Sequence, residues 1–112
     1  MHVLSEVEIE FHEAMVSIYQ RARTEAGYNA TRFLGMLSTK GGLGTAQYLL
    51  RAPTSKGYAA LWLRRRLDLT VEYAVLEAKW QSLFSDAERD IAMTRLQESG
   101  FTGPLPATKV AQ

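Results

Sequence analysis

Residues 84–101, FSDAERDIAMTRLQESGF, decide the structural class of this chain of 112 residues. Ser85 and Glu88 have the spacing of a capping box, in which each side chain satisfies a free backbone amide at the start of a helix. Apolar residues as far as Leu96 then recur on one helical face. Gly100 can take the left-handed conformation that ends a helix. The stretch therefore predicts a complete helix with both of its ends defined.

The N-terminal part of the chain repeats this pattern. Ser5 and Glu8 form a second capping box. From Val7 to Ala22, apolar residues recur every three or four positions, which places one apolar stripe along a helix. Gly27 is suited to end it. We predict one long helix between Ser5 and Gly27.

Two shorter helices are expected next. Asn29 could cap the first, and we expect this helix to end by residues 39–44, TKGGLG. Three glycines in a helix interior would cost too much backbone entropy. The second carries apolar residues on one face after the glycines, and Pro53 ends it.

The remaining helices are predicted from caps and apolar patterns. Ser55 caps a helix that follows Pro53. Asp68 or Thr70 then caps another, whose broad apolar arc from Val71 to Trp80 predicts a central, buried helix.

No segment shows the period-two alternation of a strand. We therefore predict an all-α protein, a compact bundle of five to six helices in a single domain over residues 1–101. Residues 102–112 contain glycine and two prolines and are expected to form a flexible tail. The helices on either side of Pro53 suggest a helix-turn-helix-like unit at residues 44–66. The predicted core consists of Phe11, Ile18, Leu61, Trp62, Val71, Val75, Trp80, Phe84, Ile91 and Leu96.

Composition narrows the class of protein further. The hydrophobic share of 46% and the charged share of 22% are ordinary for a globular domain. No apolar run approaches the roughly 20 residues that span a bilayer. The acidic start MHVLSEVEIEF does not resemble a signal peptide. Because the chain has no cysteine, we expect a cytoplasmic protein without disulfides or thiolate metal sites.

The candidates for catalytic chemistry are incomplete. His12 is followed by Glu13, but Val16 stands where a zinc-protease helix needs its second histidine. Glu8 and His12 are two metal ligands without a third. Residues 41–47, GGLGTAQ, lack the lysine and hydroxyl of a phosphate-binding loop. We therefore expect no catalytic residues, no metal, no cofactor and no enzymatic activity.

Charge is distributed unevenly along the chain. There is no acidic residue between Glu25 and Asp68, and the flanking segments are acidic. Such a segment can form one positive face on a protein of nearly neutral net charge. The basic residues within it are Arg32, Lys40, Arg51, Lys56, Arg64, Arg65 and Arg66.

We predict from this asymmetry a non-enzymatic binding module that contacts a polyanion, DNA or RNA, through a basic patch. Its nucleic-acid-binding residues are Lys40, Arg51, Lys56, Arg64, Arg65 and Arg66. A structural alternative for the arginine triplet is a helix C-terminus, where cations complement the dipole and pair with Asp68 or Glu72. The alternative function is a protein-protein adaptor or inhibitor, which docks on a larger protein through exposed aromatic residues such as Tyr48 or Tyr58.

The sequence resembles a family of small bacterial single-domain proteins that have no assigned activity. The similar elements are FHEAMVSIYQRA (11–22), RFLGML (32–37), GYAALW (57–62) and the stretch from RRLDLTVE to IAMTRL (65–96). The resemblance extends over residues 9–101 and implies a bacterial protein of one domain. Arg65 stands where the family pattern has glycine, and the resemblance implies no catalytic residue.

Overall fold

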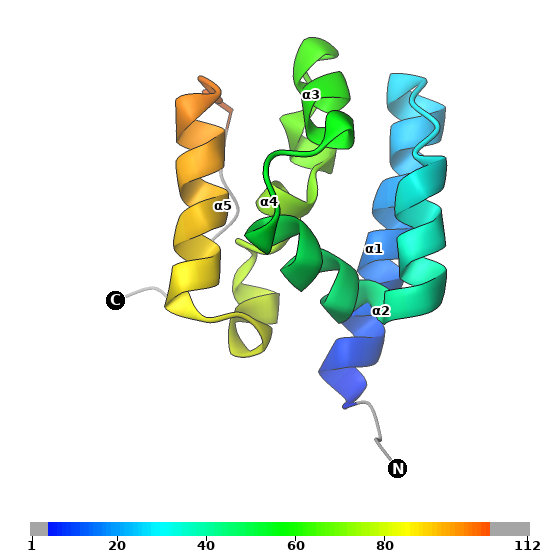
Figure 1. Cartoon of the computed structure of the whole chain (residues 1–112), viewed down its shortest axis with the longest axis vertical. Helices are drawn as coiled ribbons and strands as arrows, with labels where there is room; N and C mark the ends of the chain where they lie inside the picture. Colours follow the sequence, from blue (N-terminus) through cyan, green and yellow to red (C-terminus); the bar gives the residue numbers. More distant parts are fainter. Residues whose placement is uncertain (1–4, 104–112) are drawn as a thin grey trace.

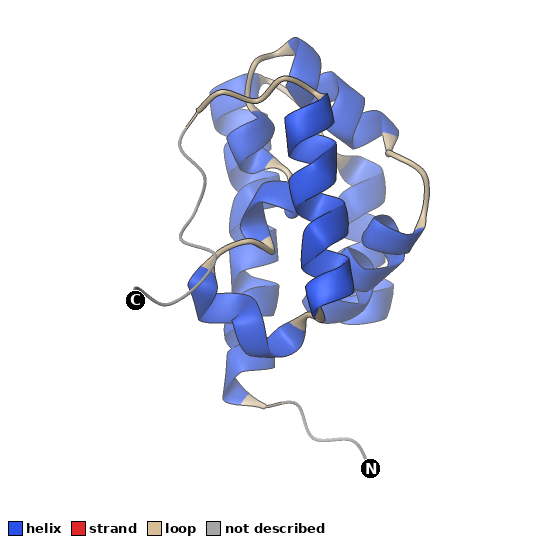
Figure 2. Cartoon of the chain, turned by 90° about the vertical axis from the view of Figure 1, so that its left-hand side faces the viewer, coloured by secondary structure: helices blue, strands red, loops and turns tan. Residues whose placement is uncertain are grey.

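A computed structural model describes residues 5–103 of the chain, and this part contains helices and no strand (Figures 1 and 2). The predicted all-α class is confirmed. Most of the predicted flexible tail, residues 104–112, lies outside the described residues. The helices in chain order are α1 (Glu6–Ala26), α2 (Thr31–Arg51), α3 (Lys56–Leu63), η1 (Leu67–Leu69), α4 (Val71–Ala74), η2 (Ala78–Leu83) and α5 (Asp86–Glu98), where η denotes a 3-10 helix.

The helices form a bundle with α1 and the first half of α2 at one side and α5 at the other (Figure 1). The α3 helix and the short α4 helix lie between them. Phe11 of α1 is completely buried, and its ring makes edge-to-face contacts with Trp80 and Phe84, each at 5.2 Å between ring centroids. Such aromatic pairs contribute about 0.5–1.5 kcal/mol each beyond the burial of their area. They join α1 to the segment that precedes α5.

Most of the predicted core is buried or packs against buried residues, but Trp62 does not belong to it. Its side chain is 49% exposed, and its indole N–H donates to the backbone carbonyl of Ser99 at 3.0 Å. The hydrogen bond holds the ring across the surface between α3 and the end of α5. The apolar pattern of α3 alone could not distinguish this position from a buried one.

The capping interactions predicted at Ser5, Ser55, Thr70 and Ser85 are present. Both capping boxes form at the starts of α1 and α5, and the Ser55 and Thr70 side chains accept backbone N–H groups at the starts of α3 and α4. Gly27 and Gly100 have positive φ angles of 67° and 75° at the ends of α1 and α5.

The predicted break at the glycines of residues 39–44 is confirmed, because helical geometry is interrupted at Gly41 and α2 consists of two helical segments that meet there at a kink. Only Gly41 leaves helical geometry, with φ 75° and ψ 171°, and it kinks α2. The amide that follows is not lost: the Gly42 N–H donates to Nδ1 of His12 at 2.9 Å. A Cβ atom at Gly42 would lie 2.5 Å from the Cα atom of His12, so glycine allows α1 and α2 to approach closely here.

The predicted cap at Asn29 is wrong. The residue that precedes α2 is Ala30, and no side chain caps this helix. The Asn29 side chain instead accepts a hydrogen bond from the hydroxyl of Tyr19 at 3.1 Å.

The predicted central helix from Val71 to Trp80 is buried but not continuous. The α4 helix ends at Ala74, and a turn leads to η2. Arg89 of α5, a buried arginine, donates from Nη1 to the Val75 carbonyl at 2.9 Å and from Nη2 to the Leu76 carbonyl at 3.3 Å. Because Arg89 satisfies these carbonyls, the helix can end early in the protein interior without leaving them unpaired.

The segment 44–66 consists of the second half of α2, a linker at residues 52–55 and α3. Figure 1 shows α3 rising steeply from the end of α2, so the expected pair of angled helices is present. Its use as a DNA-reading unit stays a prediction.

Within residues 5–103, no helix combines the length and the apolar character that crossing a membrane requires.

Candidate functional site

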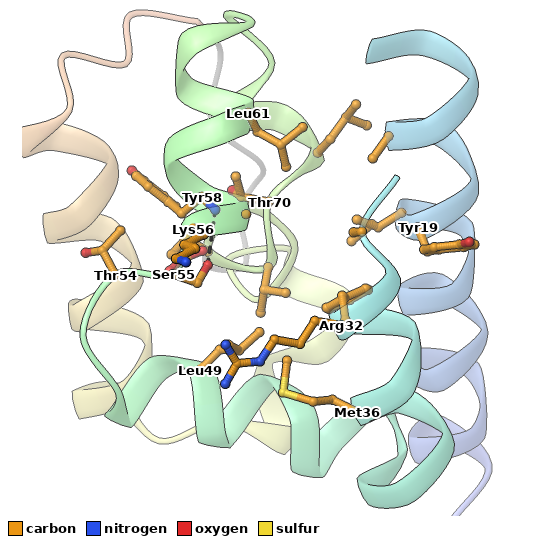
Figure 3. A pocket seen from close by; sticks show the side chains of 18 of the residues that line it. Tyr19, Arg32, Met36, Leu49, Thr54, Ser55, Lys56, Tyr58, Leu61 and Thr70 are labelled. Atoms are coloured by element: carbon orange, nitrogen blue, oxygen red, sulfur yellow. Dashed lines mark hydrogen bonds between the residues drawn. The ribbon is translucent and has the colours of Figure 1, made fainter. Parts of the chain in front are cut away.

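A pocket of about 410 Å³ opens between the second half of α1, both ends of α2, the start of α3 and the segment from Leu69 to Glu72 (Figure 3). Most of its lining is apolar. A site of this size lies within the range of about 300–1,000 Å³ that small-molecule pockets occupy.

The kink of α2 creates the pocket. Arg32 and Met36 line it from the first half of the helix, and Leu49 lines it from the second half. In a straight helix, Arg32 and Leu49 would lie about 25 Å apart along the axis. Because Gly41 turns the chain, the two halves instead form neighbouring walls (Figure 3).

The polar groups beneath the pocket have partners within the fold. Glu72 is 4% exposed, and its carboxylate accepts from Nη1 of Arg95 at 2.8 Å. Burial raises the pKa of the Glu72 carboxyl, and the bond from Arg95 opposes this shift. The Thr70 hydroxyl donates to the Leu67 carbonyl at 2.7 Å and caps α4. These groups therefore do not need a ligand.

Tyr58, which also lines the pocket, has a hydroxyl that is engaged elsewhere. This hydroxyl donates to the Arg95 carbonyl at 2.9 Å and lies 2.8 Å from the hydroxyl of Ser99. Burial raises the pKa of the Tyr58 hydroxyl. The ring is 6% exposed, so the expectation of Tyr58 as an exposed docking residue is wrong. Tyr48 is 46% exposed, as that expectation required.

Two cations of the lining have no such partners. Arg32 and Lys56 are exposed residues, and the side chain of neither forms an ion pair or hydrogen bond with any residue in the described part of the chain. Figure 3 shows the Arg32 side chain extending from the start of α2 into the pocket, with Lys56 at the start of α3. The pocket therefore carries an excess of positive charge.

Two more cations lie on tyrosine rings that line the pocket. Nζ of Lys40 is 5.0 Å from the centroid of the Tyr48 ring, and the guanidinium carbon of Arg64 is 5.3 Å from the Tyr28 centroid. Cations at this distance are attracted by the electron-rich face of the ring. Lys40, Lys56 and Arg64 of the predicted basic patch are thus arranged around this pocket.

Arg51, Arg65 and Arg66 of the predicted patch do not line the pocket. Arg66 pairs with Glu25 at 2.7 Å and with Asp68 at 3.0 Å, which is the structural role that the sequence left open for the triplet. Bonds from Arg21 and Arg66 lower the pKa of the Glu25 carboxyl to about 2. The charge of Arg66 is thereby neutralised.

Arg51, Arg64 and Arg65 remain exposed. Arg51 lies 3.8 Å from the Glu88 carboxylate, and its side chain is 74% exposed. Arg64 donates to the carbonyls of Ala26 and Ala60, each at 3.0 Å. Arg65 has a positive φ of 59° where α3 ends, a conformation in which a non-glycine residue is uncommon.

The weaker chemical candidates have structural roles. His12 accepts the Gly42 amide at the helix kink. No group of three His, Cys, Asp or Glu residues that could hold a metal is present among residues 5–103.

Sequence reasoning missed the pocket, although one signal pointed to it. The segment without acids, between Glu25 and Asp68, supplies most of the lining residues. Arg32 belongs to that segment but was not among the predicted site residues. The break at the glycines was predicted, but the sequence did not indicate how the two halves of α2 are oriented, which brings Arg32 toward Leu49.

Comparison of the chain with family models, curated proteins and solved structures found no match. The resemblance to small bacterial proteins therefore stays a prediction from the sequence.

Proposed function

We propose that this chain is a non-enzymatic binding module whose ligand occupies the pocket between α1, α2, α3 and α4. One observation carries the proposal: an open cavity of about 410 Å³ with a mostly apolar lining. A large apolar pocket with a few polar groups is the first candidate for a ligand site. A cytoplasmic location belongs to the proposal, supported by the absence of cysteine from the sequence.

Titration with Nile red, a neutral dye whose emission increases in apolar surroundings, tests whether the pocket accepts a ligand. Met36→Trp places a larger side chain in the pocket and should strongly reduce dye binding. Leu34→Trp is the matched control, because Leu34 lies on the same helix, is 40% exposed and does not line the pocket. If the wild-type protein does not bind the dye, or if both variants bind it as well as the wild type, the proposal is wrong.

The polyanion function predicted from the sequence is a second candidate, favoured by a separate observation. Arg51 and Arg65 are exposed cations outside the pocket lining. Charges of this kind can contact phosphates without base specificity. Arg66 is excluded from this set because Glu25 and Asp68 neutralise it.

Retention on a heparin column tests this second function. At about 50 mM salt, where phosphate contacts are strong, a nucleic-acid-binding protein should be retained. Replacing Arg51 and Arg65 with glutamine should reduce retention, and the Met36→Trp variant should be retained like the wild type. Lack of retention of the wild-type protein would exclude the polyanion function and leave the pocket proposal unaffected.

A further inference from the structure

We infer that the ligand of the pocket is an amphipathic carboxylate, with an apolar body inside the cavity and its anionic head group at Arg32 and Lys56. This inference rests on the proposed function and specifies the chemical class of the ligand.

The size and lining of the pocket define the body of the ligand. A cavity of about 150 Å³ holds one benzene molecule. The present cavity of about 410 Å³ therefore has room for a body more than twice as large. Its walls include Ile18, Phe33, Met36, Leu49 and Leu61, so a polar body such as a sugar would lose hydrogen bonds to water without replacing them.

The charges of the lining define the head group. The charged residues that line the pocket are Arg32, Lys56 and Glu72. Glu72 is neutralised by Arg95 at 2.8 Å and is nearly inaccessible, whereas the two cations have no acidic partner within residues 5–103. An anion would thus meet two exposed positive charges beside apolar walls, which strengthen the local field.

The residues around the pocket also favour an anionic ligand. Lys40 and Arg64 lie on the rings of Tyr48 and Tyr28, and the segment that supplies most of the lining contains no Asp or Glu that could compete for the cations. The pocket therefore discriminates against a cationic ligand of the same shape. A guanidinium can bind a carboxylate with two parallel hydrogen bonds, and Arg32 supplies such a group.

Three ligands with the same ten-carbon chain and different head groups test the inference. Decanoate, decanol and decyltrimethylammonium are used below their micelle concentrations to displace Nile red from the full chain. We expect decanoate to displace the dye at a concentration about tenfold or more below that of decanol. The trimethylammonium compound should be the weakest of the three. Added salt should reduce the advantage of decanoate, because it screens exposed charges.

Paired charge variants identify the residues responsible. Arg32→Gln/Lys56→Gln should remove the preference for decanoate over decanol, mainly by weakening the binding of decanoate. Arg23→Gln/Arg65→Gln removes the same amount of charge from exposed residues outside the lining and should retain the preference.

The outcomes separate the inference from the proposed function. If Nile red binds and decanoate is no better than decanol, the pocket binds ligands and the carboxylate assignment is wrong. If the Arg32→Gln/Lys56→Gln variant keeps the full preference, the assignment of the head group to these residues is wrong. If the wild-type protein does not bind Nile red, the proposed function itself fails.

Discussion

Replacing Arg95 with methionine removes the guanidinium that joins α5 to α4 and to the end of α2. Nη1 donates to Glu72 at 2.8 Å and to the Leu49 carbonyl at 3.0 Å, and Nη2 donates to the carbonyls of Leu50 and Ala52. The side chain of Arg95 is 16% exposed and that of Glu72 is 6% exposed. The substitution therefore leaves a buried carboxylate without its cation and three carbonyls without this donor.

The expected loss follows from these contacts. Removing one partner of a buried ion pair costs about 3–5 kcal/mol, because the other charge remains buried. Each carbonyl left unpaired in the interior adds about 1–3 kcal/mol unless water reaches it. We expect the free energy of unfolding of Arg95→Met to fall by at least about 3–5 kcal/mol, a large part of the 5–15 kcal/mol typical of a domain.

Urea unfolding of four proteins measures this loss and its origin: wild type, Arg95→Met, Glu72→Gln and the double variant. Glu72→Gln should destabilise the wild type. It should partly restore the stability of Arg95→Met, because an unpaired neutral amide costs less to bury than an unpaired carboxylate.

The dependence on pH provides a second test of the same argument. Burial raises the pKa of Glu72 even with Arg95 present, and loss of Arg95 should raise it further. A carboxyl whose pKa is raised in the folded state takes up protons on folding, so its contribution to stability decreases as pH rises through the folded pKa. The loss in free energy of unfolding caused by Arg95→Met should therefore become smaller as the pH falls. The double variant, which lacks the carboxyl, should not show this change. A deficit of less than about 1 kcal/mol, or equal destabilisation by Glu72→Gln in both backgrounds, would refute the reasoning.

Three further predictions concern the fold and are measured by urea unfolding. Gly42→Ala should strongly destabilise the protein, because the Cβ atom of the alanine would lie 2.5 Å from the His12 Cα atom. Gly35 has open space around it, so Gly35→Ala should raise the free energy of unfolding by about 0.5–1 kcal/mol. Equal effects of the two substitutions would contradict the close approach of α1 and α2. Thr45→Val should stabilise by about 1 kcal/mol, because the buried Thr45 hydroxyl has no hydrogen-bond partner among the described residues; a loss of stability would contradict this. Glu25→Gln should be less stable than the wild type at neutral pH, because the lowered pKa of Glu25 means that its charged form stabilises the folded state. This contribution is present above about pH 4.5 and is lost as the pH falls toward about 2, so the stabilities of the two proteins should converge over this range. A difference in stability that does not change with pH would argue against the ion pairs of Glu25.

Helix ends could be predicted from the sequence because they depend on residues a few positions apart. Ser5 reaches the Glu8 amide, Ser85 reaches the Glu88 amide, and Gly27 supplies the left-handed conformation after α1. None of these interactions requires knowledge of the rest of the fold.

The wrong predictions concern places where a distant residue changes the local outcome. Asn29 does not cap α2, and its side chain instead accepts a hydrogen bond from Tyr19, ten residues away. The helix that begins at Val71 stops early because Arg89 takes the carbonyls of the following turn. Patterns of apolar residues contain no information on which distant side chain supplies a hydrogen bond.

The candidate site was only partly predictable for the same reason. Lys40, Lys56 and Arg64 were expected in a nucleic-acid-binding patch, which stays a prediction, and the structure places them around the pocket. Arg66 has the same charge as Arg64 and belongs to the same triplet, but Glu25, 41 residues away, pairs with it. The sequence could indicate that the segment is basic, whereas the partner of each cation depends on the fold.

The kink at Gly41 limits which changes of chain length the protein can tolerate. Two walls of the pocket belong to one helix, so the position of the second wall depends on the number of residues that separate it from the kink. One residue inserted or deleted between Gly41 and Tyr48 would turn every later residue of α2 by about 100° around the helix axis. Tyr48 and Leu49 would then leave the pocket, while Arg32 and Met36 would stay. Proteins that share this pocket should therefore keep the number of residues in this segment unchanged, with glycine retained at position 42.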